Sequence, residues 1–398
     1  MMGRIASMRA SRAFPARLWT VVIAAAISQT GMAATDQARF DTAVNSAANA
    51  LMAQHGIPGL AIAVTAHGQR HYYNYGYASR ATRQPVTRDT LFEVGSVSKT
   101  LTATLAAYAE TQGKLSLTDS PTRHLPELKG SALEPVSLIN LATHTAGGFP
   151  LQLPDEIDTE QRLADYFRTW RPEHETVSYR TYANPSIGLL GRVAAASFGL
   201  SYTAAMQTQL LPKLGMTGTF LHIPANDVPR YAQGYNQNGE PVRLNPALLA
   251  EEAYGVKTTS EDLLRFVDAQ LGVVETDDAV SQALAATRVG YYRIGAMTQA
   301  LIWEQYSYPV ILEDLLAGNS KEMVLESQPA EALTPPLLPK ADVWVNKTGS
   351  TNGFGAYVAF IPARQVGIVI LANRYYPNED RVRLAYRILA ELSDARSD

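Results

Sequence analysis

A serine and a lysine three residues apart form the first arrangement in this chain that could do covalent chemistry. Ser96 and Lys99 begin a segment, residues 96–112, in which apolar side chains recur at helical spacing. Residues three apart share one face of a helix, so the two side chains can meet. A serine hydroxyl becomes a nucleophile when a base takes its proton. A lysine amine can be that base if burial or a nearby cation lowers its pKa, and the helix N-terminus offers N–H groups to an oxyanion.

Taken alone, this S-x-x-K pattern is weak, because two fixed positions in four are expected to recur by chance in a chain of 398 residues. The alternative interpretation is a serine near the start of a helix and a surface lysine one turn later. The catalytic interpretation therefore needs further side chains of matching chemistry.

A tyrosine and an asparagine supply a second candidate. Tyr182 and Asn184 lie just before a predicted helix that begins near Ser186. A tyrosinate held by neighbouring lysines can serve as a general base, and the asparagine amide can hold both a lysine and a substrate amide. The same Y-x-N pattern occurs at residues 72–74 and 376–378. Most such tyrosines are core residues with a satisfied hydroxyl.

The third candidate is the sequence Lys-Thr-Gly-Ser at residues 347–350, which ends a predicted strand. A strand edge can donate backbone N–H groups to a ligand lying beside it. Lys347 adds a positive charge for a carboxylate or for the tyrosine oxygen, and Thr348 adds a hydroxyl. Gly349 removes the side chain where a substrate must approach closely. The alternative is a strand end followed by a glycine-containing turn.

The order S-x-x-K, Y-x-N and K-T-G is the signature of the penicillin-recognising serine hydrolases, which include β-lactamases and D-alanyl-D-alanine peptidases. The chain resembles class C β-lactamases in particular, over essentially everything after residue 33. This resemblance selects Tyr182 among the three Y-x-N tyrosines. The segments that carry it are residues 92–99, 148–152, 253–257, 347–355 and 371–374.

The resemblance implies a role for each site residue. Ser96 would be acylated by opening of a β-lactam ring, and Lys99 and Tyr182 would share the proton transfers as a coupled set. The backbone N–H groups of Ser96 and Ser350 would form the oxyanion hole. The resemblance further implies contacts to the acyl side chain from Gln152, Asn184 and Tyr254, and to the substrate carboxylate from Asn346, Lys347, Thr348 and Asn378.

Two details bear on subclass and substrate. The class A segments Ser-Asp-Asn and Glu-x-x-Leu-Asn are missing from the sequence, which is consistent with a class C arrangement that uses the tyrosine for deacylation. Asn346 stands where many members of the family carry histidine, and Pro185 stands where alanine is common. We expect both to be tolerated.

No cofactor or metal is expected from the composition. The chain has no cysteine, and its seven histidines are scattered without a helical ligand spacing. The net charge is −3 and no basic run marks a nucleic-acid footprint. The expected partners are therefore a small-molecule β-lactam and water, and the chain is expected to be a monomer.

The N-terminus predicts export. Residues 1–17 contain four arginines and no acidic residue, residues 18–27 are largely apolar, and small residues follow at 31–33. This pattern is typical of a signal peptide, residues 1–33, cleaved after Ala33 or Ala34, and its apolar run is too short to span a membrane. An amphipathic anchor is the alternative. The mature protein is expected in the periplasm, without membrane attachment.

Strand patterns at both ends of the chain enclose helical patterns in the middle. They predict an α/β fold of the α+β type: an antiparallel sheet flanked by helices, built from both chain ends, plus an inserted mostly helical domain with long loops. The predicted domains are residues 34–114 with 310–398, and residues 115–309, with a ligand cleft between them. Helices are predicted at 41–54, 96–112, 186–195, 260–271 and 380–392, and strands at 60–64, 70–77, 344–348, 356–361 and 366–371.

Two rival functions remain open. A D-alanyl-D-alanine peptidase or a serine esterase on the same fold would share the nucleophile and differ in how fast water attacks the acyl-enzyme. A binding protein that kept the fold would be expected to lose one of the four candidate catalytic residues, Ser96, Lys99, Tyr182 and Lys347.

Overall fold

The structure is a computed structural model that describes residues 3, 34–245 and 247–394. Apart from Gly3, the predicted signal peptide lies outside these residues. Within the described part of the chain, no helix combines the length and the apolar character needed to cross a bilayer.

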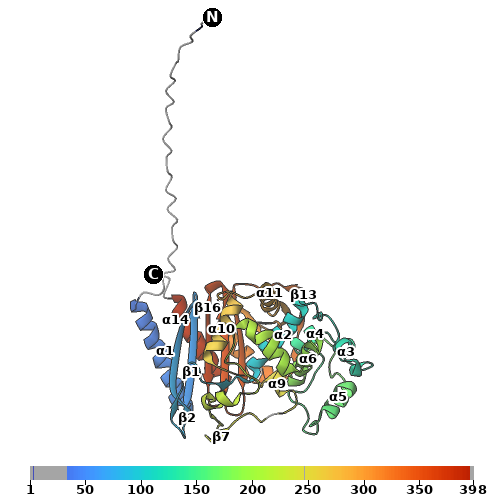
Figure 1. The fold of residues 1–398 in the computed structure, drawn as a ribbon, viewed down its shortest axis with the longest axis horizontal. Coiled ribbons are helices and arrows are strands. Elements are labelled where there is room, and N and C mark those ends of the chain that lie inside the picture. Colours follow the sequence, from blue (N-terminus) through green and yellow to red (C-terminus); the bar gives the residue numbers. More distant parts are fainter. Residues whose placement is uncertain (1–2, 4–33, 246, 395–398) are drawn as a thin grey trace.

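A ten-stranded sheet forms the centre of the molecule (Figure 1), in the order β13-β9-β10-β11-β14-β15-β16-β1-β2-β3. Each neighbouring pair is antiparallel. Near the N-terminus, Leu60 of β1 pairs with Ala372 of β16, so both ends of the chain build the sheet, as predicted. The strands are β1 (Gly59–Ala66), β2 (Gln69–Ser79), β3 (Gln84–Pro85), β9 (Gly290–Ile294), β10 (Met297–Gln299), β11 (Glu304–Ser307), β13 (Glu331–Leu337), β14 (Val343–Ser350), β15 (Gly355–Ile361) and β16 (Val366–Ala372).

Helices cover both faces of this sheet, which explains why β15 and β16 are buried along their whole length. All of β1 is buried. Successive strand residues point to opposite faces: Leu60 and Ile62 join the core beneath α1 (Ala34–His55) and α14 (Asn378–Asp394), whereas Ala61 and Ala63 join the core beneath α10 (Ser260–Leu271). Burying each leucine or isoleucine side chain contributes about 1.5–3 kcal/mol.

The helical part lies on the side of the sheet opposite α1 and α14 (Figure 1). At its centre is α2 (Ser98–Thr111), which is buried from Ser98 to Ala109 and packs against α6 (Asn184–Ser197), α9 (Ala250–Ala253) and α11 (Asp278–Ala286). The remaining helices are α3 (Pro121–His124), α4 (Leu138–Ala142), α5 (Glu160–Thr169), α7 (Tyr202–Ala205), α8 (Leu211–Leu214), α12 (Leu312–Gly318) and α13 (Glu322–Leu325).

Short two-stranded pairings tie the loops to this framework. Strand β4 (Phe92–Glu93) pairs with β8 (Lys257–Thr258), β5 (Tyr179–Arg180) with β12 (Gln328–Pro329), and β6 (Gly234–Tyr235) with β7 (Pro241–Val242). The first two pairings hold segments that flank the candidate nucleophile and tyrosine.

The domain boundary expected at residue 310 does not follow the sheet. Strands β9, β10 and β11 all precede this residue and join the ten-stranded sheet, and α10 packs on its face. Runs of three to five residues that mix polar and apolar side chains are too short for a strand period to be read. Strand β13 was also missed: it contains Pro335 and Pro336, which a sheet tolerates at its edge.

Candidate active site

The structure brings Ser96 and Lys99 into direct contact. Ser96 lies in a 3-10 turn, η1 (Gly95–Val97), which leads into α2, rather than in the α-helix itself as predicted. Lys99 is fully buried one turn later. Its Nζ donates hydrogen bonds to Ser96 Oγ at 2.8 Å and to the carbonyl oxygen of Ala253 at 2.8 Å.

The surroundings of Lys99 make its neutral form easier to reach than that of an exposed lysine. Burial, assisted by the positive charge of Lys347 and opposed by Tyr182, lowers the pKa of Lys99 to about 8. An amine with this pKa gives up its proton far more readily than an exposed lysine, as a base for the Ser96 hydroxyl would have to do.

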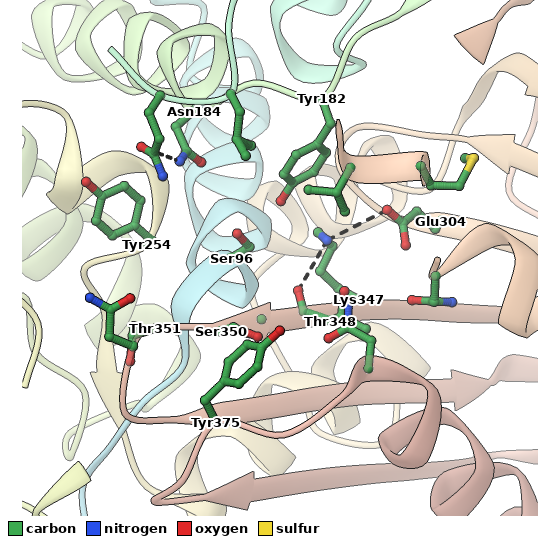
Figure 2. Close-up of a pocket in the computed structure, with 18 of the residues that line it drawn as sticks. Ser96, Tyr182, Asn184, Tyr254, Glu304, Lys347, Thr348, Ser350, Thr351 and Tyr375 are labelled. Atoms are coloured by element: carbon green, nitrogen blue, oxygen red, sulfur yellow. Dashed lines mark hydrogen bonds and ion pairs between the residues drawn. The ribbon is translucent and has the colours of Figure 1, made fainter. Parts of the chain in front are cut away.

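Tyr182 lies just before α6, with its ring facing the two lysines. The ring centroid is 5.2 Å from Lys99 Nζ and 5.1 Å from Lys347 Nζ. Burial by itself would raise the pKa of the Tyr182 hydroxyl, but the charges of Lys347 and Lys99 outweigh burial, and the pKa falls to about 8. The hydroxyl points toward the space between Ser96 and Lys347 (Figure 2).

The end of strand β14 touches the turn that carries the serine. A Cβ at Gly349 would overlap the carbonyl oxygen of Val94 and lie 3.0 Å from the backbone nitrogen of Ser96. A Cβ at Gly95, whose φ is +51°, would overlap the backbone nitrogen of Ser350. Only glycine fits at both positions. The close approach brings the backbone at Ser96 and the backbone at Ser350 together, so their two N–H groups could act as a pair of oxyanion donors.

A cavity of about 450 Å³ opens over these groups. Asn184 and Gln152 meet there, with Asn184 Nδ2 donating to Gln152 Oε1 at 2.9 Å, and Tyr254 enters from the end of α9. The predicted site residues that line the cavity are Ser96, Gln152, Tyr182, Asn184, Tyr254, Lys347, Thr348, Gly349, Ser350 and Asn378.

Asn346 is the predicted substrate-binding residue that does not line this cavity. It is completely buried, its Nδ2 donates to the Glu304 carbonyl oxygen, and its Oδ1 accepts from Asn319 Nδ2 and from the Tyr357 hydroxyl. Successive strand residues face opposite sides, so Asn346 points away from the face that carries Lys347. The expected direct contact with a substrate carboxylate is therefore wrong. Asn346 instead holds Asn319, which does line the cavity.

Sequence reasoning missed two buried charged residues beside the lysines. Glu304 on β11 lies 3.7 Å from Lys347 Nζ and accepts from Arg180 Nη2 at 3.2 Å. Arg180 also donates to Gln299 Oε1 and to the Met323 carbonyl oxygen. Neither residue belongs to a contiguous motif, so the sequence offers no spacing by which to find them.

His144, one of the seven scattered histidines, lies against Tyr182. The two rings are 4.4 Å apart between centroids. In the described ranges 34–245 and 247–394, no group of three or more His, Asp or Glu side chains is arranged to hold a metal ion.

Comparison with known proteins agrees with the resemblance seen in the motifs. A family model described as Beta-lactamase matches residues 44–393. A β-lactamase from Lysobacter lactamgenus is 49% identical over 365 residues, which are 92% of this chain and 95% of that protein.

Two crystal structures share the fold. A β-lactamase/D-alanine carboxypeptidase from Pseudomonas syringae is 53% identical, with a TM-score of 0.87 over 88% of this chain and 99% of that one. A class C β-lactamase in complex with cefoxitin is 47% identical, with a TM-score of 0.87 over 89% of this chain and 99% of that one. This chain therefore belongs to the β-lactamase family, and within it to the class C enzymes.

Proposed function

We propose that this chain hydrolyses β-lactams through an acyl-enzyme on Ser96, and that this activity confers antibiotic resistance. The observation that carries the proposal is the 2.8 Å contact between Ser96 Oγ and the buried Lys99 amine. Tyr182 lies beside that contact. The pKa of Lys99 and the pKa of Tyr182 are both about 8. The fold alone would not distinguish β-lactam hydrolysis from D-alanyl-D-alanine peptidase activity.

Acylation would begin with attack of Ser96 Oγ on the lactam carbonyl carbon. As the new C–O bond forms, the hydroxyl proton passes to the Lys99–Tyr182 pair, which titrates as a unit. The carbonyl oxygen becomes an oxyanion, and the N–H groups of Ser96 and Ser350 would stabilise it. When the lactam C–N bond breaks, the pair returns the proton to the ring nitrogen, which leaves Ser96 acylated and the pair ready for a second transfer.

Deacylation would use the same pair on a water molecule. The water attacks the ester carbonyl, the pair takes its proton, and the C–O bond to Ser96 breaks as the proton returns to Oγ. Tyr182 suits this step because the positive charges of Lys347 and Lys99 stabilise its anion. The product is released as a carboxylic acid that loses its remaining proton to solvent and becomes a carboxylate, and the enzyme returns to its starting protonation state.

Substrate binding would divide the cavity into two halves. Lys347, Thr348 and Asn378 would hold the carboxylate. On the other side, Asn184 and Gln152, already joined by a hydrogen bond, would hold the amide of the acyl side chain. Tyr254 would form the wall of that pocket, and Gly349 leaves room for the lactam to approach the strand.

We expect purified protein to hydrolyse a chromogenic cephalosporin with continuous turnover. The colour change measures the turnover, and intact mass shows whether an adduct remains on the protein. A second candidate is a D-alanyl-D-alanine peptidase, favoured by the name of the Pseudomonas syringae relative, β-lactamase/D-alanine carboxypeptidase. A single burst that leaves a stable adduct on Ser96, with release of D-alanine from a peptide, would contradict the first candidate and support the second.

The pH dependence of kcat/KM should report the Lys99–Tyr182 pair. Both pKa values are about 8, and the pair accepts the serine proton only after losing one of its own. We therefore expect kcat/KM to rise as the pH increases through about 8 and then to level off. Lys347→Ala removes a charge that lowers both pKa values, so the rise should move to higher pH.

A lysine far from the site provides the control for this experiment. Lys213 is paired with Asp277 at 2.6 Å on the surface, and Lys213→Ala should leave the profile unchanged. A profile that stays in place, or moves to lower pH, in Lys347→Ala would contradict the assignment of the pair.

We also propose that the mature chain acts in the periplasm as a monomer. The charge and apolar pattern of residues 1–33 supports export. One chain supplies all the residues named here for acylation, deacylation and substrate binding.

A further inference from the structure

We infer that His144 is a positioning residue for Tyr182: it holds the backbone on both sides of the tyrosine and the face of its ring. This inference rests on the proposed function, in which Tyr182 moves the protons. His144 follows α4 in a loop that runs alongside the segment carrying the tyrosine. The chemistry of the histidine itself takes no part in the reaction.

Two hydrogen bonds from the tyrosine segment end on this one histidine. The backbone N–H of Thr181 donates to the carbonyl oxygen of His144 at 2.9 Å. The backbone N–H of Ala183 donates to the ring nitrogen Nδ1 of His144 at 3.3 Å. The residues before and after Tyr182 are therefore both anchored to residue 144, and the tyrosine backbone between them has little freedom to shift.

The ring contact adds a third restraint. The imidazole of His144 lies 4.4 Å from the Tyr182 ring, with 45° between the planes, on a tyrosine that Lys99 and Lys347 also face. His144 adopts a positive φ of +61°, which is unusual for a residue with a side chain and for which histidine and asparagine are among the tolerated types. The strained backbone turns the side chain toward the tyrosine and keeps it there.

The burial of His144 is difficult to explain by packing alone. Its Nδ1 accepts a hydrogen bond, so in the neutral ring Nε2 carries the proton. Nε2 is buried and has no hydrogen-bond partner among the described residues, an arrangement that usually costs stability and asks for an explanation. Burial and the positive charges of Arg180, Lys99 and Lys347 hold the pKa of His144 well below its usual range, so the ring stays neutral while the lysines are charged.

The position of the Tyr182 ring matters because the pKa of its hydroxyl depends on the distance to the two lysines. The charges of Lys347 and Lys99 lower the pKa of Tyr182, and this effect weakens as the ring moves away. The charged and titratable groups that face Tyr182 are Lys99 on α2, Lys347 on β14, Glu304 on β11, Arg180 on β5 and His144 itself.

Two substitutions of His144 separate the anchor from the ring. His144→Phe keeps a ring and removes the Nδ1 acceptor, and it also places a residue type that disfavours the positive φ at this position. His144→Asn keeps an acceptor near the position of Nδ1 and tolerates the positive φ, but removes the ring. Neither change alters the net charge, because the histidine is neutral, so a shift in the titration of Tyr182 cannot come from a lost charge on residue 144.

We expect His144→Phe to lower kcat/KM for a cephalosporin by about 10²-fold, the size of effect caused by small displacements of catalytic groups. His144→Asn should stay within about tenfold of the wild type, since it loses only an aromatic contact. The rise of kcat/KM with pH should move to higher pH in His144→Phe and stay close to that of the wild type in His144→Asn.

A second measurement does not depend on turnover. Tyr182→Phe removes one tyrosine, so the difference in ultraviolet tyrosinate absorbance between the wild type and Tyr182→Phe isolates the titration of Tyr182. The same difference measured in the His144→Phe background should show this titration at higher pH. In the His144→Asn background it should remain near its wild-type position.

Asn140→Ala is the control for simple loosening of the loop. Asn140 Nδ2 donates to Thr145 Oγ1 and to the Tyr292 hydroxyl, so its removal weakens the same loop without touching Tyr182. Asn140→Ala should lower the unfolding temperature. It should leave the pH profile of kcat/KM and the tyrosinate titration of Tyr182 unchanged. Comparable titration shifts in Asn140→Ala would mean that the stability of the loop, and not the contacts of His144, determines the position of Tyr182.

The outcomes also distinguish this inference from the proposed function. If the wild type turns over cephalosporin and Tyr182→Phe is strongly impaired, but His144→Phe keeps wild-type kcat/KM and titration, the positioning role is wrong and the function stands. If Tyr182→Phe itself retains full activity, the proposed proton transfer fails instead.

Discussion

Replacing Ser96 with alanine should abolish β-lactam hydrolysis and leave the fold intact. The substitution removes the atom that forms the covalent bond, and no other hydroxyl is held 2.8 Å from the Lys99 amine among the described contacts. In other serine hydrolases, loss of the nucleophile lowers kcat by about 10⁶-fold. Steady-state kinetics on a chromogenic cephalosporin, together with intact mass after exposure to a slow β-lactam inhibitor, would measure this directly. Residual turnover near the wild-type rate, or an adduct still forming, would contradict the assignment.

Ser98 offers a matched control two residues away in the same motif. It is buried, and its Oγ accepts the backbone N–H of Val256 at 3.1 Å. Ser98→Ala should therefore lower the free energy of unfolding by about 1–3 kcal/mol, because a buried donor loses its acceptor. It should keep most of the turnover, so the pair separates loss of the nucleophile from loss of stability.

Tyr182→Phe should slow hydrolysis by about 10²–10⁴-fold, the usual contribution of a general acid–base group. The phenylalanine keeps the ring that Lys99 and Lys347 face and removes only the oxygen that exchanges protons. We expect the loss mainly in kcat, with similar thermal stability. Pre-steady-state kinetics would show whether acylation, deacylation or both are slowed.

A second buried tyrosine provides the comparison. The Tyr202 hydroxyl shares a 2.7 Å hydrogen bond with Thr102 and lies outside the residues that line the active-site cavity. Tyr202→Phe should affect stability and leave kcat close to the wild-type value. Near-normal kcat in Tyr182→Phe would show that the lysine works without the phenol.

The contiguous parts of the site and fold were predictable from the sequence. The three short motifs name their own residues, and the structure places Ser96, Lys99, Tyr182 and Lys347 around one cavity or in direct contact with it. The helix predicted at 260–271 and the strands predicted at 356–361 and 366–371 agree with α10, β15 and β16 to within a residue, because their apolar periods are long and uninterrupted.

What could not be predicted depends on contacts between distant segments. Asn346 was assigned to the substrate from the family resemblance, but it neighbours Lys347 on a strand, and such neighbours face opposite sides. Glu304 and His144 reach the lysines and the tyrosine through strand pairing and loop packing. Neither contact leaves a spacing that a single sequence displays.

The close contact between η1 and the end of β14 links formation of the active site to completion of the polypeptide chain. Gly95 and Gly349 are separated by most of the chain, and their two segments can approach this closely only because neither residue carries a side chain. A nascent chain that already contains Ser96 but has not yet reached residue 350 would lack the second oxyanion donor of the proposed mechanism. Under that mechanism, acylation of Ser96 would require both distant segments to be synthesised and docked.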